Sequence, residues 1–172
     1  MKHLRFWLLS GLLLMAGLAY SQQEPGTKTF IFIRHAEKLA EPPADPDLSE
    51  QGQKRARFVA ALLKEQPITA LYATPYLRTQ HTAKPLAELK GLAVQTYQPQ
   101  QGAGLLQQLK ARPGQETFVV VGHSNSTPAL VNSLMGREEI KPISEEDYEN
   151  LFVVTVSPQG VCSLVRMRLP LE

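Results

Sequence analysis

A short apolar segment that ends in two basic residues constrains this chain more than any other feature. Residues 29–33 read T-F-I-F-I, a β-branched and aromatic run that predicts a buried strand. Arg34 and His35 follow it directly. In a sheet covered by helices on both faces, the carboxyl ends of the strands open into the ligand crevice. The segment therefore predicts that Arg34 and His35 lie in a site, although alone it also fits a strand that ends in solvent.

Two more predicted strands are followed by basic side chains. Residues 68–73 precede a segment that contains Arg78, and residues 117–121 lead into Gly122 and His123. Strands that alternate with helices predict an α/β fold, with a largely parallel sheet covered on both faces and a closing antiparallel hairpin. The other predicted elements are a helix at 49–64, a helical pattern that follows residues 74–76 and ends at Gly91, helices at 104–111 and 128–136, a strand at 93–97, and a hairpin from strands 151–156 and 161–169.

Several residues predict how the helices begin and end. Ser49 is the expected N-cap of the first helix, and Gly91 should end the second. Pro85 lies inside the second helical pattern and should kink the helix or divide it. Ser126 or Thr127 is expected to cap the last helix, with Pro128 at its first position.

The amino-terminal segment has the pattern of a secretory signal peptide. Lys2 and Arg5 precede an apolar run at 6–18, and small residues at 19–21 suit a cleavage site. The apolar run is shorter than the roughly 20 residues of a membrane-spanning helix. We expect residues 1–21 to be removed, 22–28 to form a flexible lead and 29–172 to form one domain. The mature protein would be secreted, either periplasmic or extracellular.

Charge and cysteine content exclude some partners. Removing residues 1–21 takes two basic residues and no acidic ones, so the mature chain is formally neutral. Neither nucleic acid nor, after signal cleavage, a membrane surface is therefore an expected partner. Cys162 is the only cysteine, which leaves no intramolecular disulfide to form.

The basic residues at the strand ends suit a phosphoryl group. Arginine forks match its oxygens and stay charged, while a neutral imidazole can attack phosphorus. Neither a metal nor another cofactor is required. A zinc site is disfavoured, because the usual histidine spacings are absent and the cationic neighbours oppose a dication.

Four ordered motifs make the chain similar to a known family. They read I-R-H-A-E at 33–37, L-S-x-x-G at 48–52, T-P-x-x-R-T-x-x-T-A at 74–83 and V-G-H-S at 121–124. This pattern resembles the histidine phosphatase superfamily, also called phosphoglycerate-mutase-like, and is closest to its short phosphohistidine phosphatase branch. The resemblance implies a three-layer α/β/α fold and a phosphorylated His35. It also implies that Arg34, Arg78 and His123 bind the phosphoryl group.

The proton donors usual in that family have no counterpart in this chain. The mutase-like branch has a Glu beyond the third strand, where residues 95–101 carry no carboxylate, and the acid-phosphatase branch has an Asp where this chain has Ser124. Glu37, Asp45 and Asp47 are the candidate substitutes, although each is by default a solvated surface acid.

Three other polar features lie near the motifs. Ser124 precedes a helix and should add phosphate donors with the free N–H groups of that turn. His81 shares a helix face with Arg78 and could reach substrate, but an exposed helical histidine is favoured. The charged connection at 137–150 is interpreted as a solvated face without a catalytic role.

The leading functional hypothesis is a secreted phosphatase that hydrolyses phosphomonoesters or phosphohistidine, on small molecules or phosphoproteins, through phospho-His35. One alternative is a phosphate-binding module of the same fold with little turnover. Another is a phosphoglycerate mutase. Because model histidine titrates near about pH 6.5, we expect the rate to rise through mildly acidic pH.

Overall fold

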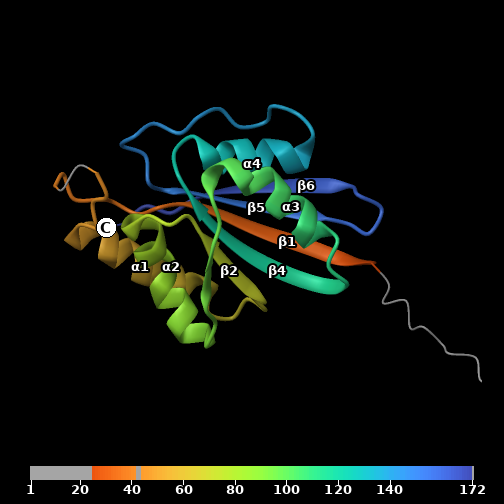
Figure 1. Cartoon of the computed structure of the whole chain (residues 1–172), viewed down its shortest axis with the longest axis horizontal. Helices are drawn as coiled ribbons and strands as arrows, with labels where there is room; N and C mark the ends of the chain where they lie inside the picture. Colours follow the sequence, from red (N-terminus) through yellow and green to blue (C-terminus); the bar gives the residue numbers. More distant parts are fainter. Residues whose placement is uncertain (1–24, 42–43, 172) are drawn as a thin grey trace, which may run out of the picture.

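The computed structural model describes residues 25–41 and 44–171. Within them, one six-stranded sheet has the order β3-β2-β4-β1-β5-β6. Helices α1 and α2 cover one face, and α3 and α4 cover the other (Figure 1). The bounds are β1 Pro25–Arg34, α1 Glu50–Leu63, β2 Ala70–Ala73, α2 Leu77–Lys90, β3 Val94–Thr96, the 3₁₀ helix η1 Pro99–Gln101, α3 Gly102–Lys110, β4 Gly114–Gly122, α4 Ser126–Met135, β5 Asn150–Val156 and β6 Cys162–Arg168.

The predicted fold class is confirmed. β1 to β4 form the parallel part of the sheet, in which β1 pairs with β4, and β2 pairs with both β4 and β3. β5 runs antiparallel to β1 and pairs with β6 in the predicted closing hairpin. Parallel strands are joined through helices, which is why the helices come to lie on both faces.

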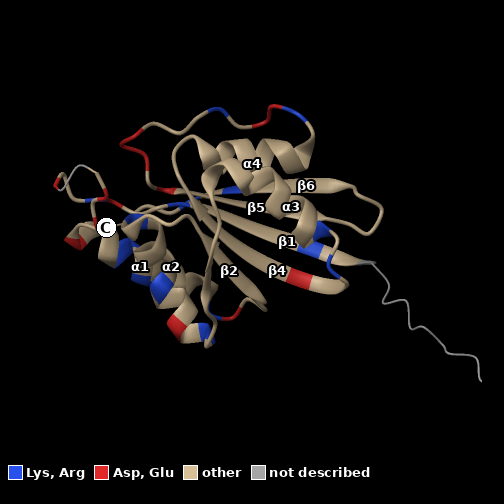
Figure 2. Cartoon of the chain, viewed as in Figure 1, with Lys and Arg blue, Asp and Glu red and all other residues tan. Residues whose placement is uncertain are grey.

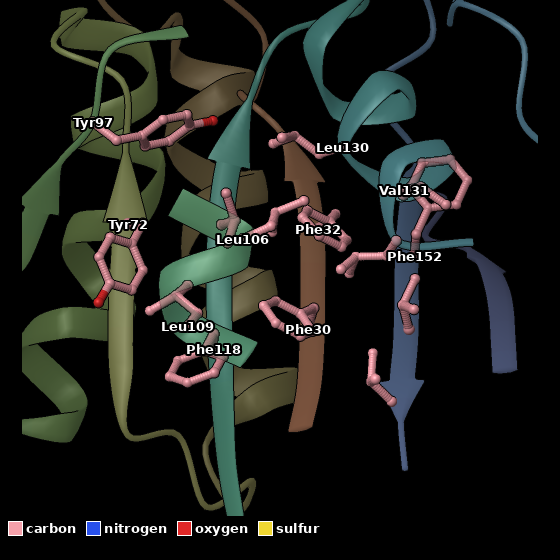
Figure 3. Packing of buried hydrophobic residues seen from close by; sticks show 14 of the residues in the cluster. Phe30, Phe32, Tyr72, Tyr97, Leu106, Leu109, Phe118, Leu130, Val131 and Phe152 are labelled. Carbon is pink, nitrogen blue, oxygen red and sulfur yellow. The ribbon is translucent and has the colours of Figure 1, made fainter. Parts of the chain in front are cut away.

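Side-chain alternation along the central strand β1 builds two hydrophobic cores. Phe30 and Phe32 point into the core beneath α3 and α4, as Figure 3 shows. Ile31 and Ile33 point into the other core, beneath α1 and α2. All four side chains are buried. Because burying one such side chain contributes about 1.5–3 kcal/mol, this strand is a large part of what holds the layers together.

Two predicted helix ends are confirmed. The Ser49 side chain accepts a hydrogen bond from the backbone N–H of Gly52 at 3.1 Å and caps α1. Gly91 ends α2 in the left-handed conformation, with φ 64°, which favours glycine. The prediction that Pro85 divides α2 is wrong, because one helix runs through it. Buried Ala83 and Leu86 pack on the core on both sides of the proline and offset the single hydrogen bond that it removes.

Two other boundaries differ from the sequence predictions. β1 begins at Pro25, so residues 25–28 belong to the strand and not to a lead, and buried Lys28 donates a hydrogen bond to the carbonyl of Gly114. Asn125 occupies the N-cap position of α4 without a capping hydrogen bond from its side chain, and Pro128 is the third residue of the helix. The Ser126 hydroxyl instead accepts a hydrogen bond from the backbone N–H of His123 at 2.9 Å. The predicted signal peptide at 1–21 and residues 22–24 of the lead lie outside the described residues.

None of the helices in residues 25–41 and 44–171 has the length and apolar character needed to cross a membrane.

We predict that Phe32→Ala lowers the free energy of unfolding by about 3–5 kcal/mol, because it leaves a cavity in a packed core. Phe58→Ala is the matched control, since the Phe58 side chain on α1 is 37% exposed whereas Phe32 is fully buried. Denaturant-induced unfolding measures both. Equal losses for the two variants would show that β1 does not carry the core.

Candidate active site

The carboxyl ends of β1, β2 and β4 open into one cavity of about 720 Å³. His35 follows β1, and His123 follows β4. Arg78 lies in the first turn of α2, which follows β2 after a short turn. All three side chains line the cavity. The strand ends that were predicted to share a site therefore do lie together, because parallel strands end at the same edge of the sheet.

The ring of His35 is held in one tautomer. Its Nδ1 lies 2.8 Å from the backbone carbonyl of Ala36, and a carbonyl can only accept, so Nδ1 carries the proton. Nε2 therefore keeps its lone pair. Burial lowers the pKa of His35 to about 3 against the effect of the Ala36 hydrogen bond, and the charges of Arg34, His123 and Arg78 lower it further. At neutral pH the ring is uncharged, which is the state in which an imidazole can attack phosphorus.

A chain of hydroxyl groups orients His123. The Thr79 hydroxyl shares its one proton between the carbonyls of Thr74 and Tyr76, both at 2.8 Å. It therefore has no proton left for the Thr74 hydroxyl, 2.8 Å away, and accepts a hydrogen bond from that group. The Thr74 oxygen then accepts from Nε2–H of His123 at 2.9 Å. Nδ1 is left for a ligand. Its lone pair can accept a hydrogen bond, and it becomes a donor when the ring is protonated.

The two histidine rings face each other across the site. Their centroids are 5.4 Å apart with an interplanar angle of 67°. Burial lowers the pKa of His123 to about 4, aided by Arg78 and Arg34 and opposed by Glu145. The expected titration near pH 6.5 is therefore corrected for both rings, because burial beside cations disfavours the imidazolium form. A bound phosphoryl dianion would raise both pKa values again.

Arg78 keeps donors available for an anion. Its guanidinium carbon lies 4.4 Å from the ring centroid of Tyr76, and Nη1 lies 3.4 Å from Oδ1 of Asp45. The Nε–H group is buried without an acceptor among the described residues. A fork with unused donors at a cavity wall suits the oxygens of a phosphoryl group.

Arg34 lies behind the cavity, and its terminal nitrogens are occupied by the connection at 137–149. The side chain is fully buried, with its guanidinium carbon 4.1 Å from the ring centroid of Tyr148. Nη1 donates to the carbonyls of Ser144 and Asp147, and Nη2 to the carbonyl and carboxylate of Glu145. Its Nε has no acceptor among the described residues. Arg34 thus organises this connection, and its predicted contact with phosphate stays a prediction.

Two of the three candidate proton donors are held by other partners. The Glu37 carboxylate binds the Arg55 guanidinium at 2.7–3.0 Å. Asp47 lies 2.5 Å from Nδ1 of His81, and both line a separate cavity of about 450 Å³. Asp45 accepts from the backbone N–H of Leu77 and contacts Arg78 at the margin of the site. None of the three carboxylates lines the cavity that contains the histidines.

Ser124 lines the cavity as predicted, but its hydroxyl binds a carboxylate that the sequence interpretation set aside. Ser124 Oγ donates to Oε1 of Glu145, which also lines the cavity. Lys38 and Tyr76, to which no role was assigned, lie in its wall as well. The described residues contain no group of three His, Cys, Asp or Glu side chains placed to hold a metal ion.

Strand order is the signal that could have revealed Glu145. β5 runs antiparallel to β1 with Leu151 opposite Ile33, so the residues just before β5 must lie beside the end of β1. The charged connection therefore comes to lie beside the end of β1 on its way from α4 to β5. Figure 1 shows its course, and Figure 2 shows its charged residues.

Comparisons with known proteins agree with this geometry. Residues 30–99 match the model of the histidine phosphatase superfamily (branch 1). Phosphoserine phosphatase 1 of Hydrogenobacter thermophilus is 40% identical over 70 residues, which cover 37% of this chain. The match spans only 33% of that relative, about a third of its length.

Solved structures share the fold at low sequence identity. The protein histidine phosphatase SixA, complexed with tungstate, has a TM-score of 0.66 and 18% identity, over 81% of this chain and 96% of its own. A mycobacterial glucosyl-3-phosphoglycerate phosphatase has a TM-score of 0.66 and 14% identity, over 84% of this chain and 100% of its own.

We predict that acid destabilises the fold through these two histidines. In the unfolded chain each takes up a proton near pH 6.5, but in the fold only near pH 3 or 4. The unfolded state binds more protons between these values, so the free energy of unfolding falls as pH drops from 6.5 towards 4, by at most about 1.4 kcal/mol per pH unit for each histidine. Denaturant unfolding at several pH values should show a shallower fall in His35→Gln. An identical fall in wild type and variant would contradict the lowered pKa.

Proposed function

We propose that this chain, of which residues 30–99 match the histidine phosphatase superfamily model, is a phosphatase that forms a covalent phosphate on Nε2 of His35. The observation that carries this proposal is the state of that ring. A hydrogen bond to Ala36 places the proton on Nδ1, and burial keeps the ring uncharged at neutral pH. Nε2 can therefore attack phosphorus without first losing a proton.

The reaction consists of two displacements at phosphorus. In the first, the Nε2 lone pair of His35 forms a bond to phosphorus while the P–O bond to the leaving group breaks. In the second, a water oxygen attacks phosphorus, and the P–N bond electrons return to Nε2. Arg78 supplies charge and donors for the phosphoryl oxygens in both steps. His123 adds a donor from Nδ1 when the bound phosphate has raised its pKa.

The cavity supports small phosphomonoesters as the substrate class. Its volume of about 720 Å³ lies within the usual range for small-molecule sites. Lys38, Gln100 and Asn125 line it and offer polar groups to the organic part of a substrate. The partial match to a phosphoserine phosphatase supports the same class. Phosphohistidine, on a small molecule or a phosphoprotein, is the other substrate class that the site could take.

Two further parts of the proposal rest on separate observations. The signal-like pattern of residues 1–21 supports secretion to the periplasm or the exterior. A phosphate-binding module with little turnover is the second candidate function. It is favoured by the finding that Glu37, Asp45 and Asp47 do not line the cavity.

We predict that the mature protein, mixed with a ³²P-labelled aryl phosphate and quenched, carries acid-labile, base-stable label on His35. An aryl leaving group is chosen because it departs without a proton donor. His35→Ala should abolish both the label and turnover, whereas His81→Ala, altered in a separate cavity, should retain both. Binding of inorganic phosphate without label or turnover would establish the binding module instead.

A further inference from the structure

The connection between α4 and β5 forms part of the wall of the active-site cavity, and hydrogen bonds hold it there. Arg34 Nη1 donates to the carbonyls of Ser144 and Asp147 at 2.6 and 3.0 Å, and Nη2 donates to the carbonyl of Glu145 at 2.9 Å. The backbone N–H of Ile143 donates to the carbonyl of Ser124 at 3.0 Å. This connection is therefore positioned by the ends of the two central strands, β1 and β4.

This fastening directs the carboxylate of Glu145 into the cavity. Oε2 lies 2.9 Å from Arg34 Nη2, and Oε1 accepts a hydrogen bond from the Ser124 hydroxyl. Glu145 lines the same cavity as His35 and His123. Its side chain is 65% exposed, so the group can exchange protons with water and with a bound substrate. Among the described carboxylates, it is the one that lines this cavity.

We propose that Glu145 is the proton donor to the leaving group and the acceptor of the water proton in the phosphatase reaction. This inference rests on the proposed function and assigns a role that none of the sequence candidates fills. The carboxylate lines the same cavity as His35, so a substrate bound there can bring its leaving oxygen within the hydrogen-bond reach that proton transfer requires.

The charges around Glu145 change when a substrate binds. Without substrate, the Ser124 hydrogen bond lowers its pKa against a smaller effect of burial, and the positive charges of Arg34 and Lys38 lower it further. Glu146 is the neighbouring acid, and its carboxylate binds the Ser144 hydroxyl. A phosphoryl group in the cavity would add negative charge next to Glu145 and compete for the same cations. Both effects raise the pKa of Glu145, so the substrate complex favours its protonated form.

The proton balance closes over one catalytic cycle. A phosphomonoester has its second pKa near about 6, so the monoanion brings a proton that the Glu145 carboxylate can take. As the P–O bond breaks, this proton moves from Glu145 to the leaving oxygen, and the leaving group departs as an alcohol. When water attacks the phosphohistidine, Glu145 takes a proton from that water. The P–N electrons return to His35, and Glu145 passes the water proton to a phosphate oxygen. Dihydrogen phosphate then leaves, and Glu145 is again a carboxylate.

The test compares Glu145→Gln with Glu146→Gln on alkyl and aryl phosphates. An alkyl alkoxide needs a proton during P–O cleavage, but a phenolate of low pKa does not. We expect Glu145→Gln to lower kcat/KM for an alkyl ester such as phosphoserine by about 100-fold or more. The same variant should change the rate of para-nitrophenyl phosphate only a few-fold. Glu146→Gln, one residue further along the same connection, should leave both rates unchanged.

Three results would overturn the proposal. Equal slowing of both esters by Glu145→Gln would indicate that the residue only positions the connection. Faster turnover and lower KM for both esters would show that the carboxylate competes with phosphate for Arg34 and Ser124. Unchanged rates would remove Glu145 from the reaction. In each case wild-type labelling of His35 by the aryl phosphate would still hold. If wild type gave neither label nor turnover, the proposed function itself would have failed.

Discussion

One hydrogen bond, from Nδ1 of His35 to the carbonyl of Ala36, determines what the rest of the site can do. Two neighbouring hydrogen bonds connect the end of β1 with β4 and with α2. The backbone N–H of His35 donates to the carbonyl of Gly122 at 2.9 Å, and the N–H of Ala36 donates to the Thr82 hydroxyl at 2.9 Å. Thr82 in turn donates to the carbonyl of Arg78. The Thr82 hydroxyl therefore links the backbone next to His35 with the backbone of Arg78, which fixes the two residues relative to each other before any reaction.

Much of the fold could be predicted from sequence, because its signals are local. The apolar run of β1 and the spacing of apolar residues in α1 identify a buried strand and an amphipathic helix without reference to the rest of the chain. Parallel strands end at one edge, so the positions of His35, Arg78 and His123 after their strands were enough to predict that they meet. The family resemblance also followed from these strand ends.

The contacts that the sequence did not reveal depend on packing between distant segments. No local pattern shows that Arg55 binds Glu37, that His81 holds Asp47, or that Ser126 serves the end of β4 instead of capping α4. The interpretation of residues 137–150 as a solvated face did not reveal that Glu145, which is 65% exposed, also lines the cavity. The place of Glu145 was set by the antiparallel pairing of β5 with β1. The lowered pKa values of His35 and His123 likewise arise from burial and from cations on other strands.

The central claim is that His35 is an uncharged imidazole with its lone pair on Nε2. Nitrogen-15 NMR of the phosphate-free mature protein at pH 7 tests it most directly, with His35→Gln used to assign the signals. The account predicts a protonated Nδ1 and an unprotonated Nε2 for His35, unchanged from pH 5 to pH 8 because its pKa lies near 3. A proton on Nε2, or an imidazolium that titrates near pH 6.5, would contradict it.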